Sequence, residues 1–288
     1  MSIFIEMFQY PFIVRAFIVG GLVSLCAALL GVSLVLKQYS MIGDGLSHVS
    51  YGALCIALAC NVAPLKVSIP VVIVAAFFLL RMTQRGVMKS DAAIAAVSAS
   101  ALAIGVSVTS MTTGMTMDVS SYMFGSILAM TKNDVILSIV LSLVVLFLFC
   151  FSYRHIFAVT FDENFGRATG VRVGFYNGMI SILTAVTIVL GMQMMGAMLI
   201  SSLLIFPALT SMRVFQSFRG VVLSSGILSV VCFALGMTVS YQSAMPAGAS
   251  VVLANLAAFL LFFVIQKIRA KVTIFSTFSA VEGERQKK

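Results

Sequence analysis

Charged side chains are scarce in this sequence. Asp, Glu, Lys and Arg make up 9% of its 288 residues, whereas hydrophobic residues make up 61% and the mean hydropathy is +1.12. A soluble globular domain carries about 25% charged residues, so this composition excludes that class. The chain is predicted to be an all-α, polytopic integral membrane protein.

Cysteine is also sparse, and several enzyme motifs are missing. The five cysteines form no CxxC pair, which argues against a disulfide framework or a zinc knuckle. The sequence has no GxxxxGK[ST] phosphate loop and no GxSG-type elbow paired with a histidine. We therefore expect neither an ATPase nor an intramembrane protease, and the chain is predicted not to be an enzyme.

Long uncharged runs predict the membrane crossings. A hydrocarbon core of about 30 Å needs about 20 apolar residues in a helix. The charge-free run 173–212 is about twice that length, so it must turn once, and the glycines of Gly191–Gly196 favour that place. The sequence predicts nine crossings, or eight if Met194–Met212 is broken or re-entrant. They are 16–36, 45–65, 67–80, a span between Asp91 and Asp118, a span between Asp134 and Arg154, two within 173–212 and two within 220–266. The span 67–80 is short alone and can extend into Thr83 and Gln84 or into the end of the preceding loop.

The basic residues predict the orientation, because cytoplasmic loops carry an excess of Lys and Arg. Nine helices with a cytoplasmic C-terminus leave only Arg15, Lys66 and Lys132 of the 18 basic residues outside. The net charge of +9 then reflects topology and contact with anionic lipid, and no nucleic-acid partner is expected. Residues 1–288 are predicted to form a single transmembrane domain with a cytoplasmic segment at 154–172 and a cytoplasmic tail at 267–288. No cleavable signal peptide is expected at the N-terminus.

The stretch "MIGDGLSHVS", residues 41–50, places Asp44 four residues before His48 at the start of a predicted crossing. Positions i and i+4 share one helix face, so the carboxylate and the imidazole can converge on one ion, with Tyr51 one turn further along. Asp44 as a helix N-cap and His48 as a packing residue are the alternative. Ionisable groups within apolar segments cost about 2.5–3.5 kcal/mol each and usually mark a transport pathway, which favours the ion site.

A second informative segment lies at 153–174, in a predicted cytoplasmic loop. Phe161, Phe165 and Ala168 recur at helical spacing between charged residues, and Gly170 follows as a stop signal. Such an amphipathic helix either docks into a partner's groove or lies on the membrane surface.

These residues resemble a known family, the permease subunits of bacterial zinc and manganese ABC importers. The stretch "LKQYSMIGDGLSHVSYGALCIALA" is similar to the element that opens the family's second transmembrane helix. "YMFGSILAMTKNDV" (122–135), "FDENFGRATGV" (161–171), "GMQMMGAMLISSLLIFPALTSMRV" and "MPAGASVVLANLAAF" match in the same order. The resemblance extends from Ala16 to Phe263, and one departure is Gly45, where many relatives have Ala.

The resemblance implies a function and a set of site residues. Asp44 and His48 would be the intramembrane metal ligands, with Ser47 and Tyr51 as their nearest supporting residues. The cargo would be Zn²⁺ or Mn²⁺, less plausibly Fe²⁺, with no tightly bound cofactor, in a multi-pass protein of the bacterial plasma membrane. The partners would be cytoplasmic ABC ATPase subunits, an extracellular solute-binding protein and a second copy of the chain. The residues implied in ATPase coupling are Phe161, Asp162, Glu163, Phe165, Arg167 and Gly170.

Two rival interpretations remain open from the sequence. An ion-coupled secondary metal transporter would work without an ATPase, but it is expected to show inverted repeats and more intramembrane acids. A structural scaffold predicts that replacing Asp44 and His48 leaves metal uptake intact. Because a proton on His48 competes with a metal ion, the metal site also predicts that transport weakens below about pH 6.

Overall fold

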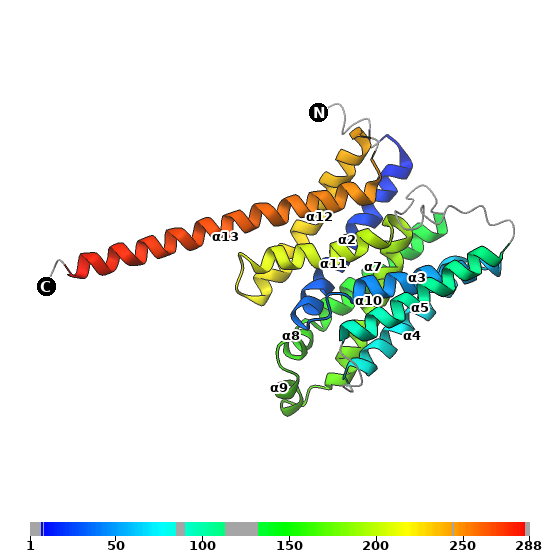
Figure 1. Ribbon diagram of the computed structural model, residues 1–288, viewed down its shortest axis with the longest axis horizontal. Coiled ribbons are helices and arrows are strands. Elements are labelled where there is room, and N and C mark those ends of the chain that lie inside the picture. The colour runs from blue at the N-terminus through cyan, green and yellow to red at the C-terminus, as the bar shows by residue number, and fades with distance from the viewer. Residues whose placement is uncertain (1–6, 8, 85–89, 113–131, 244, 286–288) are drawn as a thin grey trace.

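Helices make up all of the regular structure in the part of the chain that can be described. The computed structural model describes residues 7, 9–84, 90–112, 132–243 and 245–285. Figure 1 shows the helices gathered in a bundle, from which the C-terminal helix α13 projects far to one side. The predicted all-α membrane fold is confirmed within these ranges.

Eight helices among the described residues are long and apolar enough to cross a membrane. A further helix, α11, has 16 residues and rises about 24 Å, less than the hydrocarbon thickness. Together these nine helices match the nine predicted segments in order. They are α2 (Pro11–Leu36), α3 (Ile42–Ala59), α4 (Pro64–Gln84), α5 (Ser90–Met111), α7 (Lys132–Phe151), α10 (Val173–Met195), α11 (Ala197–Met212), α12 (Phe218–Ser243) and α13 (Ala247–Arg285).

The break between α10 and α11 falls at a single glycine inside the stretch predicted for it. Gly196 has φ 88° and ψ 162°, a conformation that is essentially confined to glycine. The chain therefore turns without a loop, and α11 packs against both α10 and α2. The prediction that the run 173–212 turns at Gly191–Gly196 is confirmed.

One predicted helix end is wrong, and one short predicted span is longer. The segment predicted to end at Leu65 ends at Ala59, because Asn61 takes a left-handed conformation with φ 54° and the Val62 N–H bonds back to the Ala57 carbonyl at 2.9 Å. The span predicted at 67–80 gains both of its expected extensions, since α4 runs from Pro64 to Gln84 and is a full crossing of 21 residues.

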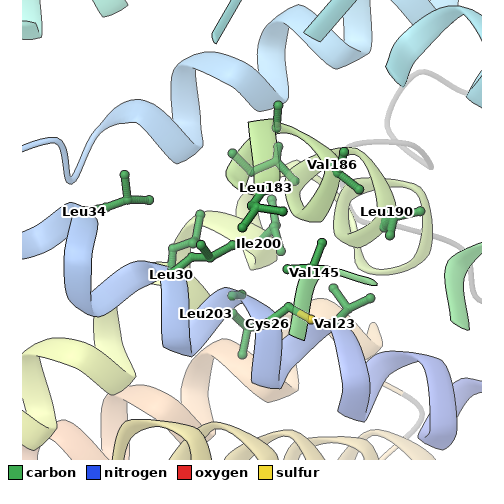
Figure 2. Close-up of a cluster of buried hydrophobic side chains, with 14 of the residues drawn as sticks. Val23, Cys26, Leu30, Leu34, Val145, Leu183, Val186, Leu190, Ile200 and Leu203 are labelled. Carbon is green, nitrogen blue, oxygen red and sulfur yellow. The ribbon is translucent and has the colours of Figure 1, made fainter. Parts of the chain in front are cut away.

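Helix α2 lies at the centre of the bundle. Its side chains meet α7, α10 and α11 in one buried cluster (Figure 2). Lipid tails are as apolar as these side chains, so close packing and dispersion contacts hold the helices together more than expulsion of water does. The labelled members are Val23, Cys26, Leu30, Leu34, Val145, Leu183, Val186, Leu190, Ile200 and Leu203.

Candidate functional site

Helix α3 places Asp44 and His48 on one face. The Asp44 Oδ2 and His48 Nε2 atoms lie 3.7 Å apart, one helical turn from each other. The Asp44 side chain is 50% exposed and that of His48 20%, although most of α3 is buried. The pair is therefore partly exposed on a largely buried helix, and its oxygen and nitrogen can approach one ion together.

The alternative role of Asp44 as a helix N-cap is wrong. Helix α3 begins at Ile42 with Met41 in the N-cap position, and no side chain caps it. Asp44 lies within the first turn, where the helix dipole favours a negative charge. Its carboxylate is thus not engaged by the backbone donors that an N-cap would satisfy.

Ser47 and Tyr51 surround the pair in different ways. The fully buried Ser47 hydroxyl donates to the Asp44 carbonyl oxygen at 2.7 Å, which anchors the start of the helix. The Tyr51 ring is buried in a small cluster with Cys55 of α3 and with Met192 and Ala197, which flank the break between α10 and α11. Tyr51 therefore joins the helix that carries Asp44 and His48 to that break.

Helix α5 approaches α3 so closely that a glycine is required. A Cβ on Gly52 would lie 2.7 Å from the Ala101 carbonyl oxygen. The Tyr51 ring lies at the same contact between α3 and α5, against Gly105 of α5. Small residues of this kind allow helix backbones to meet in lipid, and here they fix the face that α3 turns toward α5.

The predicted coupling segment forms two short helices instead of one. Helix α8 spans Tyr153–Phe161 and helix α9 spans Glu163–Ala168. The chain is extended at Asp162, whose carboxylate accepts hydrogen bonds from the backbone N–H groups of Asn164 and Phe165 at 2.9 and 3.0 Å. The continuous amphipathic helix expected through Phe161 and Phe165 is therefore wrong, because Asp162 caps a new helix between them.

The other coupling residues divide into exposed and structural positions. Phe161 and Phe165 are 58% and 62% exposed, large apolar groups on the outside of the segment. Gly170 ends α9 in a left-handed conformation with φ 84°, and the Val171 N–H bonds to the Gly166 carbonyl at 2.9 Å. The Arg167 guanidinium lies 3.9 Å from the Glu163 carboxylate and is exposed.

Glu163 faces the bundle, and this brings in two residues that sequence analysis missed. Its Oε1 atom accepts hydrogen bonds from Lys37 Nζ and from Asn177 Nδ2, both at 2.9 Å. Lys37 served in the sequence only as the boundary of a crossing, and Asn177 is a lone amide at the start of another. A polar side chain at the end of an apolar run was the available signal.

A model of the ABC 3 transport family matches residues 9–266 of this chain. The chain belongs to that family. The ATPase of such transporters is a separate subunit, so the predictions of a non-enzymatic permease in the bacterial plasma membrane are confirmed. Residues 122–131 of one resembling stretch lie outside the described residues.

Named relatives agree with this assignment. The manganese import system permease protein ScaB of Streptococcus gordonii is 28% identical, over 91% of this chain and 94% of the relative. The high-affinity zinc uptake system membrane protein ZnuB of Buchnera aphidicola is 28% identical, over 86% and 95%. The solved structure of PsaBC from Streptococcus pneumoniae in complex with Fab superimposes with a TM-score of 0.81 at 26% identity, covering 91% of this chain and 94% of that one.

Proposed function

We propose that this chain is the permease subunit of an ATP-driven importer of divalent transition-metal ions, Zn²⁺ or Mn²⁺. An extracellular solute-binding protein delivers the ion, Asp44 and His48 hold it during passage, and a cytoplasmic ATPase drives the cycle through the α8–α9 segment. The observation that carries the proposal is the separation of 3.7 Å between Asp44 Oδ2 and His48 Nε2, both partly exposed on one face of the largely buried α3.

The chemistry of this pair suits an ion in transit. A carboxylate oxygen and an imidazole nitrogen are ligands for both Zn²⁺ and Mn²⁺. A transport site must replace part of the water shell of the ion and yet release it, so few ligands serve better than a closed cage. The ion is cargo, and the proposal includes no tightly bound cofactor.

A second copy of the chain would complete the coordination. The described residues contain no group of three or more His, Cys, Asp and Glu side chains that could hold a metal ion. Zn²⁺ prefers four protein ligands or water, and Mn²⁺ up to six. Two chains that meet at the partly exposed Asp44 and His48 would supply two carboxylates and two imidazoles. The half-exposed Asp44 side chain supports this arrangement.

The α8–α9 segment supports a docking role for the ATPase. Phe161 and Phe165 present apolar rings at the end of the bundle that carries Lys37, the predicted cytoplasmic end. Asp162 caps the start of α9 and Gly170 ends it, so the segment has a defined helical structure. We assign the ATPase contact to Phe161, Phe165 and Arg167, and the internal attachment of the segment to Glu163.

The proposal is tested by replacing the pair in cells. Asp44→Ala and His48→Ala, singly and together, are expected to reduce cellular zinc or manganese accumulation to the level of a strain without the permease, because either loss leaves too few ligands. Metal content is measured by mass spectrometry at matched membrane levels of the protein. Asp91→Ala provides the control, since Asp91 is an exposed carboxylate at the start of α5. Normal accumulation in the double variant would contradict the proposal.

The need for an ATPase distinguishes the ATP-driven importer from the secondary-transporter alternative. Membership in the ABC 3 transport family supports the ATP-driven mechanism. Purified permease reconstituted alone is expected to show no metal uptake, whereas uptake driven by a proton or sodium gradient without a nucleotidase would favour the alternative.

A further inference from the structure

Three polar side chains from distant parts of the chain meet at the end of the bundle beside α9. Lys37 Nζ donates to Glu163 Oε1 at 2.9 Å and to Asn177 Oδ1 at 2.5 Å. Asn177 Nδ2 donates to the same Glu163 oxygen at 2.9 Å, which closes the triangle. Lys37 follows α2, Glu163 begins α9 and Asn177 belongs to α10, so this polar cluster of Lys37, Glu163 and Asn177 joins three elements.

The Lys37 end of the cluster is withdrawn from solvent. The Lys37 side chain is 8% exposed and Asn177 is 3% exposed, whereas the Glu163 side chain is 39% exposed. Burial lowers the pKa of Lys37, and the Glu163 carboxylate opposes that shift. Burial alone would raise the pKa of Glu163, but the hydrogen bonds from Asn177 and Lys37 and the nearby positive charges hold it below its usual value. Loss of the Glu163 carboxylate would therefore leave the Lys37 ammonium without its ion-pair partner at a poorly hydrated position.

A short, ordered connection leads from Lys37 to the metal pair. The Gln38 N–H bonds to the Val35 carbonyl at 3.1 Å and the Tyr39 N–H to the Leu34 carbonyl at 2.9 Å, a Schellman motif that closes α2. Gln38 itself is left-handed with φ 61°, a conformation that is uncommon for a residue with a Cβ. The Ile42 N–H then bonds to the Tyr39 carbonyl at 3.1 Å as α3 begins.

This connection between Glu163 and Asp44 is short and hydrogen-bonded. Lys37 is fixed to Glu163 on one side and to the closed end of α2 on the other, and Asp44 lies in the first turn of the next helix. These bonded neighbours form a continuous connection between α9 and the start of α3. Elements with discrete arrangements that share such contacts are the physical means by which distant sites are coupled.

We propose that the polar cluster of Lys37, Glu163 and Asn177 transmits ATPase-driven movement of α9 to the Asp44–His48 pair. The inference rests on the proposed function and adds positioning residues to it. Lys37 and Asn177 touch neither the metal pair nor the outer face of α9; they act through Glu163. Since an ion pair in which one partner is 39% exposed adds little stability, stability alone does not account for a lysine at this position.

The test compares coupling with stability in the full permease–ATPase complex reconstituted in proteoliposomes. Glu163→Gln leaves the buried Lys37 cation without a carboxylate, so it is expected to lower the melting temperature. The Lys37→Met/Glu163→Gln double variant removes both charges and is expected to regain much of that loss, because contacting residues are not additive. The number of metal ions imported per ATP hydrolysed is nevertheless expected to stay at least about fivefold below wild type in both, the lower range of known coupling factors.

Two further variants complete the design. Lys37→Arg keeps the ion pair and is expected to import metal with close to the wild-type ratio, whereas Lys37→Met is not. Lys66→Met is the matched control, since Lys66 is exposed near the start of α4, beyond the far end of α3. If the double-variant protein is not produced in the membrane, Lys37→Arg and Lys37→Met at matched protein levels provide the comparison.

The outcomes separate this inference from the proposed function. A double variant that regains its melting temperature but not its transport ratio supports the inference, and one that imports at the wild-type ratio overturns it. Equal ratios for Lys37→Arg and Lys37→Met also overturn it. Asp44→Ala is measured in parallel: normal import by that variant would refute the proposed metal site itself, whatever the cluster variants do.

Discussion

At the scale of single residues, two polar sites lie close together in the sequence at the junction of α2 and α3. The buried Lys37 side chain contacts a carboxylate and an amide, and Asp44 is half exposed one turn from His48. Each charge has a different environment and therefore a different use. The buried lysine holds helices together, and the open carboxylate remains available to an ion.

The lowered pKa of Glu163 predicts how the stability of this end depends on pH. The native state binds this proton less readily than the unfolded chain, so the stabilisation is complete above the ordinary pKa of 4.5 and is lost as pH falls through the lower native value. We expect the difference in melting temperature between wild type and Glu163→Gln to be constant from pH 7 to about 5 and to shrink below about 4. Thermal unfolding in detergent, followed at several pH values, measures this difference; a gap that widens toward acid would contradict the assignment.

At the scale of elements, Asp162 is expected to determine whether α9 keeps its shape. Asp162→Ala removes both cap hydrogen bonds and should cost the segment about 1 kcal/mol. Because α9 has only six residues, that loss is expected to weaken copurification of the ATPase while membrane insertion is unchanged. Asp162→Asn retains a capping oxygen and should bind the ATPase nearly as wild type does. Identical copurification of the Ala and Asn variants would show that the cap does not matter.

The break between α10 and α11 provides a second test at this scale. Any residue with a Cβ is strained at the φ and ψ of Gly196, by about 1–3 kcal/mol. Gly196→Ala is therefore expected to lower the melting temperature and to disturb Tyr51, which packs beside the break. Gly178→Ala is the matched control, because an added Cβ there meets nothing within 4 Å. A Gly196→Ala protein as stable as the control would contradict the strained geometry.

The elements also show how far the sequence could predict this molecule. Apolar length and glycine placement predicted the crossings and the break at Gly196, since both depend on local chemistry and on bilayer thickness. The spacing of Asp44 and His48 predicted their shared face, which is a property of any helix. The split at Asp162 was missed because helical periodicity continued through it, and a capping aspartate interrupted the helix instead.

The polar cluster could not be predicted, for a different reason. Lys37 lies 126 residues from Glu163 and 140 residues from Asn177 in the chain. No local pattern connects them, because their contact depends on how α2, α9 and α10 pack. The same holds for Tyr51 beside Met192 and Ala197.

At the scale of the whole molecule, the proposed ATPase contact and the proposed metal pair lie in different parts of the fold. In the proposed function, the exposed Phe161 and Phe165 contact the ATPase at one end, and the partly exposed Asp44 and His48 bind the ion together with a second copy of the chain. The cluster around Lys37 lies between them. An importer needs such a link, because ATP hydrolysis and ion passage occur in different places.

Metal uptake by the reconstituted complex tests the central claim most directly. Proteoliposomes that contain the permease and its ATPase, supplied with the metal-loaded binding protein and ATP, are compared for wild type and for Asp44→Asn/His48→Gln. We expect the wild type to accumulate Zn²⁺ or Mn²⁺ and the double variant to fall to the level without ATP, while the ATPase remains bound. Accumulation by the double variant at the wild-type rate would contradict the claim that this carboxylate and this imidazole carry the ion.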